Sequence, residues 1–221
     1  MKNTHNPMWD EDPRYRSLYT LTEVARYARV SADTLRSWSG GLVVPAEPKS
    51  PSPFSFVNLV EAHVMVALRR IHHIRMSQIR SAIEWLGNAH HTLHPLAEVD
   101  LLTDGREIFV KELNQTVSAS ARGQASFSEI VDLYLHRIER DAGQVPTRFY
   151  PFTYDNCPKA IVMDPAVAFG RPVIVGTRIA TTMVFDRYSG GESLTAIARD
   201  YDLEIEAVEE ALRCEIERRA A

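Results

Sequence analysis

The first half of the chain is organised around residues 19–38, which read YTLTEVARYARVSADTLRSW. Thr20 and Glu23 have the spacing of a capping box, in which two side chains satisfy free backbone N–H groups at the start of a helix. Ser31 is suited to cap a second helix after a short turn. Leu35 and Trp38 fall on one face of that second helix, where they can pack against the first. The spacing therefore predicts two short helices joined by a tight turn, as in a helix-turn-helix.

The segments on either side of this pair complete a small helical head. Residues 1–17 are polar and predict a flexible arm. Residues 39–56 are rich in glycine and proline, which predicts a loop or wing. Apolar residues then recur at helical spacing from Asn58 to about Ile71 and from Ser77 to about His91, so two further helices are expected.

Over roughly residues 18–86, the order and spacing of these elements resemble the MerR family of winged helix-turn-helix proteins. Two places depart from the family pattern. Arg36-Ser37-Trp38 stands where the family usually has Arg-Tyr-Tyr, and Phe54-Ser55-Phe56 lacks the arginine that usually lies between two wing tyrosines. The resemblance implies that the head binds DNA, with the second helix in the major groove.

Local charge agrees with a nucleic-acid partner for the head. Residues 14–80 hold ten Lys and Arg against four Asp and Glu, although the whole chain has a net charge of −4. Arg36 is the first candidate for a phosphate or base contact, since it lies on the exposed side of the second helix. Any one of these residues could equally be an ordinary solvated side chain. The full set of candidate DNA-binding residues is Thr34, Arg36, Ser37, Lys49, Arg14, Arg16, Arg69, Arg70 and Arg75.

The middle of the chain has a different pattern. Asp104-Gly105 lies between two apolar-rich runs in residues 99–110, which predicts a β-hairpin. Residues 126–142 have helical spacing, and the prolines of residues 143–158 predict an extended linker. No internal repeat is apparent in the sequence.

The last segment begins with IVMDPAVAFGRPVIVGTRI at residues 161–179. Two short strands, 161–163 and 173–175, are expected there, and Gly176 is placed to supply a backbone conformation that a side chain would forbid. Three short helices should follow, at about 182–189, 194–201 and 205–219. Their expected core residues are Ala196, Ile197, Tyr201, Ile205, Val208 and Leu212.

This segment closely resembles a small domain of unknown function with the hallmark Gly-x-Pro-x-Ile-x-Gly-Thr-Arg-Ile. The resemblance covers about residues 157–218 and implies an antitoxin that pairs with a PIN-type ribonuclease toxin. Combined with a MerR-like head, the chain looks like a VapB-type antitoxin. Its last helices also resemble a helix-turn-helix, but the final helix is rich in glutamate and would be repelled by phosphate. The module is therefore expected to bind protein or to dimerise through Gly170, Pro172, Ile174, Gly176, Thr177, Arg178 and Ile179; a monomeric structural domain is the plain alternative.

Several other classes of function have little support. The two cysteines are far apart, and the histidines and aspartates lack the spacing of a metal or catalytic site, so no metal, cofactor or enzymatic activity is expected. No run of about 18 apolar residues and no signal peptide is present, which predicts a cytoplasmic protein without a membrane partner.

The predicted fold is mainly α-helical with small β-hairpins. It comprises a MerR-like winged helix-turn-helix head at 18–95, a bridging hairpin, helix and linker at 96–156, and a three-helix, helix-turn-helix-like module with preceding short strands at 157–219. The predicted function is that of a homodimeric antitoxin that neutralises a PIN-type ribonuclease toxin and represses its own operon by binding operator DNA. The alternative is a stand-alone MerR-like regulator, but such regulators usually continue into a long dimerisation helix where this chain has the Asp104-Gly105 pattern.

Overall fold

The computed structural model describes residues 12–70, 76–99, 133–151 and 157–220. It divides into two compact units, residues 1–147 and 148–221, each considered by itself below. The division falls before Cys157, where the C-terminal module was expected to begin. The predicted hairpin at 99–110 lies, apart from Val99, outside the described residues, as do residues 126–132 of the predicted helix at 126–142.

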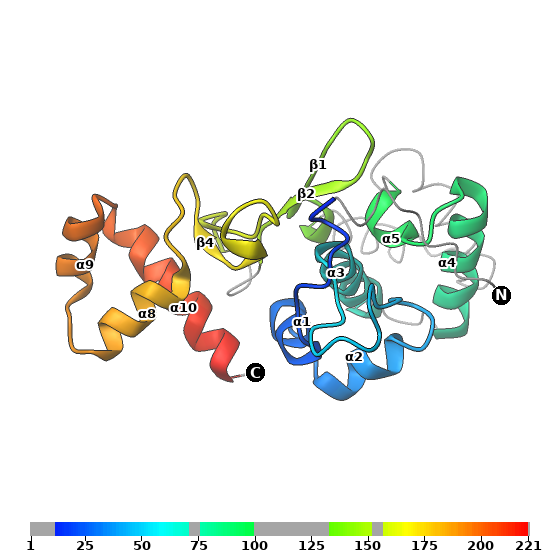
Figure 1. The fold of residues 1–221 in the computed structure, drawn as a ribbon, viewed down its shortest axis with the longest axis horizontal. Coiled ribbons are helices and arrows are strands. Elements are labelled where there is room, and N and C mark those ends of the chain that lie inside the picture. The colour runs from blue at the N-terminus through cyan, green and yellow to red at the C-terminus, as the bar shows by residue number, and fades with distance from the viewer. Residues whose placement is uncertain (1–11, 71–75, 100–132, 152–156, 221) are drawn as a thin grey trace, which may run out of the picture. The chain divides into compact units, whose positions relative to one another are not determined.

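The first unit is built around one buried helix, α3 (Phe56–Arg70). Figure 1 shows α3 in the middle of this unit, and contacts join it to α1 (Leu21–Ala28) and α5 (Pro95–Glu98). Helix α2 (Ala32–Trp38) packs on α1, and α4 (Met76–His90) packs on α5. The largest fully buried side chains of this unit are Leu35, Phe54, Phe56, Leu59, Met65, Leu68, Ile79, Leu86 and Leu96. The expected helices are therefore present, and their apolar faces form the core.

The turn between α1 and α2 follows the expected chemistry. The Thr20 hydroxyl accepts a bond from the Glu23 N–H, and the Glu23 carboxylate accepts one from the Thr20 N–H, so the capping box is confirmed. Arg29 then takes a left-handed conformation, φ 58° and ψ 48°, which ends α1. The Ser31 hydroxyl accepts a bond from the Thr34 N–H and starts α2.

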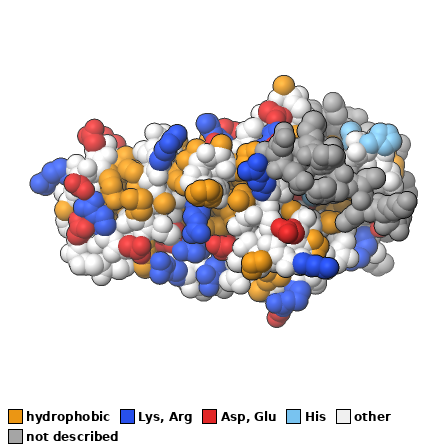
Figure 2. Space-filling model, viewed as in Figure 1, with side chains coloured by type: hydrophobic (Ala, Val, Ile, Leu, Met, Phe, Trp, Pro, Cys, Tyr) orange, Lys and Arg blue, Asp and Glu red, His pale blue; other side chains and the backbone are white. Residues whose placement is uncertain are grey.

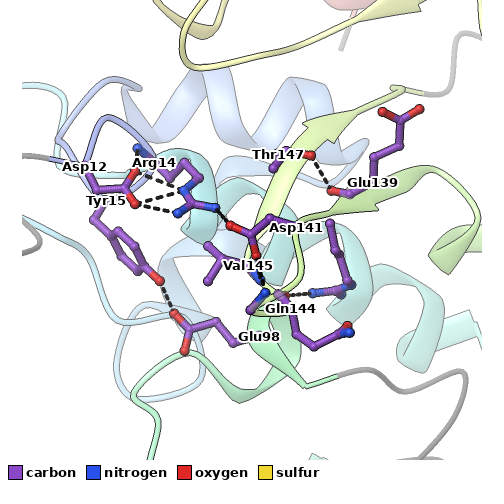
Figure 3. Close-up of polar contacts among 11 residues, drawn as sticks. Asp12, Arg14, Tyr15, Glu98, Glu139, Asp141, Gln144, Val145 and Thr147 are labelled. Atoms are coloured by element: carbon purple, nitrogen blue, oxygen red, sulfur yellow. Dashed lines mark hydrogen bonds and ion pairs between the residues drawn. The ribbon is translucent and has the colours of Figure 1, made fainter.

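Two expectations for the first unit are wrong. Residues 12–17 are not a free arm, because Arg14 and Tyr15 bond to Asp141 and Glu98 (Figure 3). The predicted helix does not continue to residue 142, because residues 138–140 form strand β1 (Ile138–Arg140) instead. Helical residues 133–135 precede it.

A side-chain-stabilised turn is the physical reason for this second correction. The Asp141 carboxylate accepts bonds from the N–H groups of Gly143 and Val145, and Gln144 takes a left-handed φ of 66°. Aspartate commonly closes turns in this way. The chain therefore reverses direction at Asp141 and returns as β2 (Pro146–Phe149), which pairs with β1. Strand β2 lies in the segment 143–158, which we expected to be an extended linker.

The second unit is a β-hairpin covered by three helices. Strands β3 (Ile161–Val162) and β4 (Val173–Ile174) are antiparallel, with Ile161 opposite Ile174. A 3-10 turn, η2 (Ala168–Gly170), lies in the connection between them. Helices α8 (Thr181–Ser189), α9 (Leu194–Tyr201) and α10 (Ile205–Ala220) then follow as expected. Their shared core contains Ile161, Ile174, Val184, Ile197, Ala198, Val208, Ala211 and Cys214. Two expected core residues are placed wrongly, since Ala196 is exposed and Ile205 is 36% exposed at the start of α10.

The turn that follows α9 has the same backbone geometry as the turn that follows α1. Helix α9 has eight residues, as α1 does, and it ends at Asp202 in the left-handed conformation that Arg29 adopts, φ 54° and ψ 51°. The next N–H reaches back to the same helical position in both turns: Val30 to the Ala25 carbonyl and Leu203 to the Ala198 carbonyl, each at 2.9 Å. Each unit therefore contains one helix-turn pair with the same local geometry.

Candidate functional site

The exposed face of α2 carries the first group of predicted DNA-binding residues. Arg36 forms an ion pair with Asp33 one turn earlier, and their side chains are 63% and 91% exposed. An ion pair this exposed contributes little to stability, so the guanidinium can exchange Asp33 for another anion at small cost. The Ser37 hydroxyl donates to the Thr34 carbonyl at 2.6 Å, and the Thr34 hydroxyl lies 2.8 Å from the Ser31 hydroxyl. Arg36 is therefore the cationic side chain that α2 presents to solvent.

The remaining basic candidates have different environments. Lys49 and Arg69 are exposed and have no polar partner among the described residues. Arg16 is also exposed. The side chain of Arg70 and the whole of Arg75 lie outside the described residues, so the structure does not place them.

Arg14 differs from these residues because carboxylates hold its guanidinium. Asp12 accepts bonds from it at 2.7 to 3.0 Å, and Asp141 accepts another (Figure 3). Hydrogen bonding to Arg14 lowers the pKa of Asp141. Arg14 thus fastens the N-terminal segment to the β1–β2 turn, a role that the sequence did not indicate.

The loop at residues 43–55 carries Lys49 and is fixed at both ends. Phe54 pairs with Tyr19 as an isolated antiparallel bridge, and its carbonyl accepts bonds from the N–H groups of Leu18 and Tyr19 at 2.9 Å. Asn58, fully buried on α3, bonds the loop at Val44, Ala46 and Ser55. The sequence analysis missed Asn58, because its partners lie up to fourteen residues away.

A buried acid–base pair lies directly behind Asn58. The Glu61 carboxylate accepts a bond from the Asn58 side chain at 3.1 Å and lies 3.2 Å from Nδ1 of His94. Burial raises the pKa of Glu61 despite these partners. Burial opposes protonation of His94, but the Glu61 carboxylate outweighs it and raises the pKa of His94. His94 is buried, although the nearby His90 and His91 are exposed.

In the second unit, the predicted protein-binding residues mainly build the β-hairpin. Pro172 and Ile174 are buried. The Thr177 hydroxyl donates to the Ile174 carbonyl at 2.9 Å and accepts a bond from the Ile179 N–H at 3.0 Å. Gly176 has a φ of 78°, as expected for a residue that must adopt a left-handed backbone. Among the predicted residues, Arg178 is exposed and has no polar partner in the described part of the chain.

The same unit exposes large apolar side chains that the sequence analysis did not select. Figure 2 shows hydrophobic side chains reaching the surface of this unit. Phe169 is 81% exposed and has a left-handed φ of 55°, beside Ala168 with a φ of 48°. Alanine and phenylalanine rarely adopt a left-handed backbone, so the turn at residues 164–171 must stabilise this conformation. The conformation leaves the Phe169 side chain exposed to solvent. The other strongly exposed residues are Val175, Met183, Tyr188 and Ile216.

Metal binding and cysteine reactivity depend on how the His, Cys, Asp and Glu side chains of the described residues are placed. Nowhere in the described ranges do three His, Cys, Asp or Glu side chains gather as they would around a metal ion. Cys157 and Cys214 are free and buried, and burial raises the pKa of Cys214 to about 12, which keeps its thiol protonated near neutral pH. Among the helices that the structure describes, none has the length and apolar character required to span a membrane.

Part of the C-terminal unit matches a known protein family. Residues 161–213 match a family described as a protein of unknown function, DUF433. The match lies within the segment for which we expected a domain of unknown function.

Relatives extend over nearly the whole chain. A Mycobacterium tuberculosis protein named "Putative antitoxin VapB45" is 28% identical over 88% of this chain and 92% of its own length. A second protein from that organism, "Uncharacterized protein Rv2308", is 23% identical over 89% of each. The crystal structure of Rv2018 from Mycobacterium tuberculosis is 27% identical, with a TM-score of 0.73, and covers 90% of this chain and 98% of that one. The combination of the two units is therefore shared with other proteins.

Proposed function

We propose that this protein is an antitoxin that neutralises a PIN-type ribonuclease toxin and represses its own operon by binding operator DNA. The observation that carries the proposal is the similarity, over nearly the full length of both chains, to the relative named as a VapB45 antitoxin. No enzymatic activity is proposed, because an antitoxin acts by binding.

The DNA-binding half of the proposal rests on the first unit. The α1–α2 turn, the exposed Arg36 on α2 and the pinned 43–55 loop together fit a winged helix-turn-helix of the MerR type. Helix α2 would enter the major groove, while Lys49 and Arg69 would contact phosphates. Arg14 is the weakest of the nine candidates because its guanidinium is already bonded to two carboxylates.

The toxin-binding and dimerisation half rests on the second unit. Arg178 and the exposed apolar side chains provide a surface with both charge and hydrophobic area, as protein interfaces commonly do. In a homodimer, two heads would meet two half-sites of a palindromic operator.

Co-expression with the neighbouring gene tests the antitoxin role. We expect the tagged chain to retain a small nuclease that is released only by denaturant and that degrades RNA once it is freed. If the chain purifies alone and the neighbour is harmless to cells, the antitoxin proposal fails. DNA binding is tested separately, by gel shift on the upstream region at several salt concentrations.

A further inference from the structure

One buried side chain, Asn58 on α3, holds the 43–55 loop in place. Its Oδ1 accepts bonds from the N–H groups of Ala46 and Ser55 at 3.2 and 3.1 Å. Its Nδ2 donates to the Val44 carbonyl at 2.8 Å. Two N–H donors face one amide atom and a carbonyl faces the other, so only one orientation of this amide satisfies all of its partners.

Glu61 completes that arrangement from within the core. Its Oε2 accepts the second Nδ2 bond of Asn58 at 3.1 Å and lies 3.2 Å from Nδ1 of His94. Asn58, Glu61 and His94 are 0%, 1% and 7% exposed. A polar chain this deeply buried is costly unless every member is satisfied, so a change at His94 must alter the bonding available to Glu61 and Asn58.

The polar network around His94 also includes residues of α5 and of the N-terminal segment. Glu98 accepts bonds from the hydroxyl groups of Tyr15 and Thr92, and the Tyr15 bond is drawn in Figure 3. The Tyr15 ring lies 5.8 Å from the His94 ring, centroid to centroid. Among the described residues, the charged and titratable groups that interact with His94 include Glu61 from α3, Glu98 from α5 and Tyr15 from the N-terminal segment.

We propose that Glu61 and His94 are positioning residues for the 43–55 loop, and that the proton they share sets how firmly Asn58 holds the loop and its Lys49. When that proton is present, Glu61 can bond His94 and Asn58 together. When it is lost, a buried carboxylate faces a neutral imidazole, and the bond to His94 survives only if the ring presents an N–H at Nδ1. The consequence for DNA rests on the proposed DNA binding, but the coupling itself does not.

The sign of the pH effect follows from the pair. Glu61 raises the pKa of His94 above its ordinary value of 6.5. The stabilisation of the loop is therefore fully present below pH 6.5 and is lost as the pH rises through the folded-state pKa of His94. The pair titrates as a unit, so both partners should report one midpoint in that range.

Nuclear magnetic resonance on the full chain tests the coupling without DNA. The amide resonances of Ala46 and Ser55 and the His94 ring resonance should move with the same pH midpoint. In Glu61→Gln, which keeps an acceptor for Asn58 but cannot ionise, the two amides should stop following pH in that range. Wild-type amides that ignore the His94 midpoint would overturn the proposal even if no variant folds.

A matched control comes from α3, the helix that carries Asn58 and Glu61. His63 is 1% exposed and bonds the Tyr134 carbonyl, which lies outside the 43–55 loop. His63→Asn therefore removes a buried histidine of α3 but should leave the Ala46 and Ser55 titration intact, whereas His94→Asn should abolish it. If both variants abolish the titration, the effect is general destabilisation and the proposal is wrong.

Titration of DNA binding at fixed salt separates this inference from the proposed function. Affinity for the upstream duplex should fall by about tenfold across the His94 midpoint, the size of one lost charged contact, and Glu61→Gln should flatten that profile. If DNA binds equally well across the range, the loop effect has no role in binding and the inference fails while the proposed function stands. If no DNA binds at any pH but the amides still follow His94, the DNA-binding half of the proposed function fails while the coupling survives.

Discussion

Arg36 and Asp33 together set the charge that α2 presents to a ligand. Because their ion pair is highly exposed, it adds little to folding and can be changed without harm to the head. We expect Arg36→Ala to weaken DNA binding by about 1–3 kcal/mol if it reads a base, or to reduce the salt dependence by about one unit of slope if it contacts phosphate. Fluorescence anisotropy at several salt concentrations distinguishes the two.

Asp33→Asn provides the opposite test at the same place. It removes the carboxylate that competes with DNA for Arg36 and also repels phosphate, so affinity should rise. Equal affinities for wild type, Arg36→Ala and Asp33→Asn would show that α2 does not meet the DNA.

For single residues, the sequence predicts side-chain bonds between residues that are close in the chain, but not bonds between residues that are far apart in it. The cap at Thr20 and Glu23 and the cap at Ser31 were predictable because partners three residues apart in a helix must meet. The roles of Asn58 and His94 were not predictable, since Glu61 and His94 are 33 residues apart and meet only after the helices pack. Arg14 illustrates the same limit, because Asp141 is 127 residues away.

The two helix-turn pairs have similar turns but carry residues of opposite charge at the same position after the turn. Arg36 lies seven residues after the left-handed Arg29, and Glu209 lies seven residues after the left-handed Asp202. The same backbone therefore presents a cation in the first unit and a carboxylate in the second. Phosphate would be attracted by one and repelled by the other.

This charge reversal predicts that α10 does not contact DNA. Neutralising its exposed start with Glu206→Gln and Glu209→Gln should leave DNA affinity and its salt slope unchanged within error, in contrast to Asp33→Asn on α2. Anisotropy on the same upstream duplex measures both. A clear gain in affinity from the α10 variant would mean that the second unit approaches the DNA closely enough to repel it.

Two serine caps, one in each unit, give a stability test of the helices that they begin. Ser31 caps α2 and Ser193 caps α9, each through a side-chain bond to a backbone N–H at 3.1 and 3.2 Å. Replacing either serine with alanine should cost about 1 kcal/mol of unfolding free energy, measured by urea denaturation. Thr195→Ala, exposed on α9 and outside the cap, is the control, and a similar loss there would remove the capping explanation.

Among larger elements, hydrophobic spacing predicted α3, α4, α8, α9 and α10, but not the β1–β2 hairpin. The helical pattern of residues 126–142 was interrupted by the Asp141–Gly143 turn, whose side-chain bonds outweigh helix periodicity. The similarity of the turns at Arg29 and Asp202 was also not predicted, because it lies in backbone conformation rather than in shared residue types.

Charge is unevenly distributed between two segments of the chain, one in each unit. Residues 14–80 carry a charge excess of +6, from ten basic and four acidic residues, while residues 159–221 carry −3, from eight and eleven. The structure separates these two segments into different compact units. Division of labour between the units is therefore the simplest physical arrangement if the protein binds DNA and another protein as proposed.

Paired variants test that division in the full chain. Arg36→Ala should lose DNA affinity but retain the co-expressed toxin through purification. Arg178→Ala, in the second unit, should retain less toxin yet bind a half-site duplex as wild type does, because a half-site does not depend on dimerisation. If Arg178→Ala weakens half-site binding as much as Arg36→Ala does, or if Arg36→Ala releases the toxin, the two activities share a surface and the division of labour is wrong.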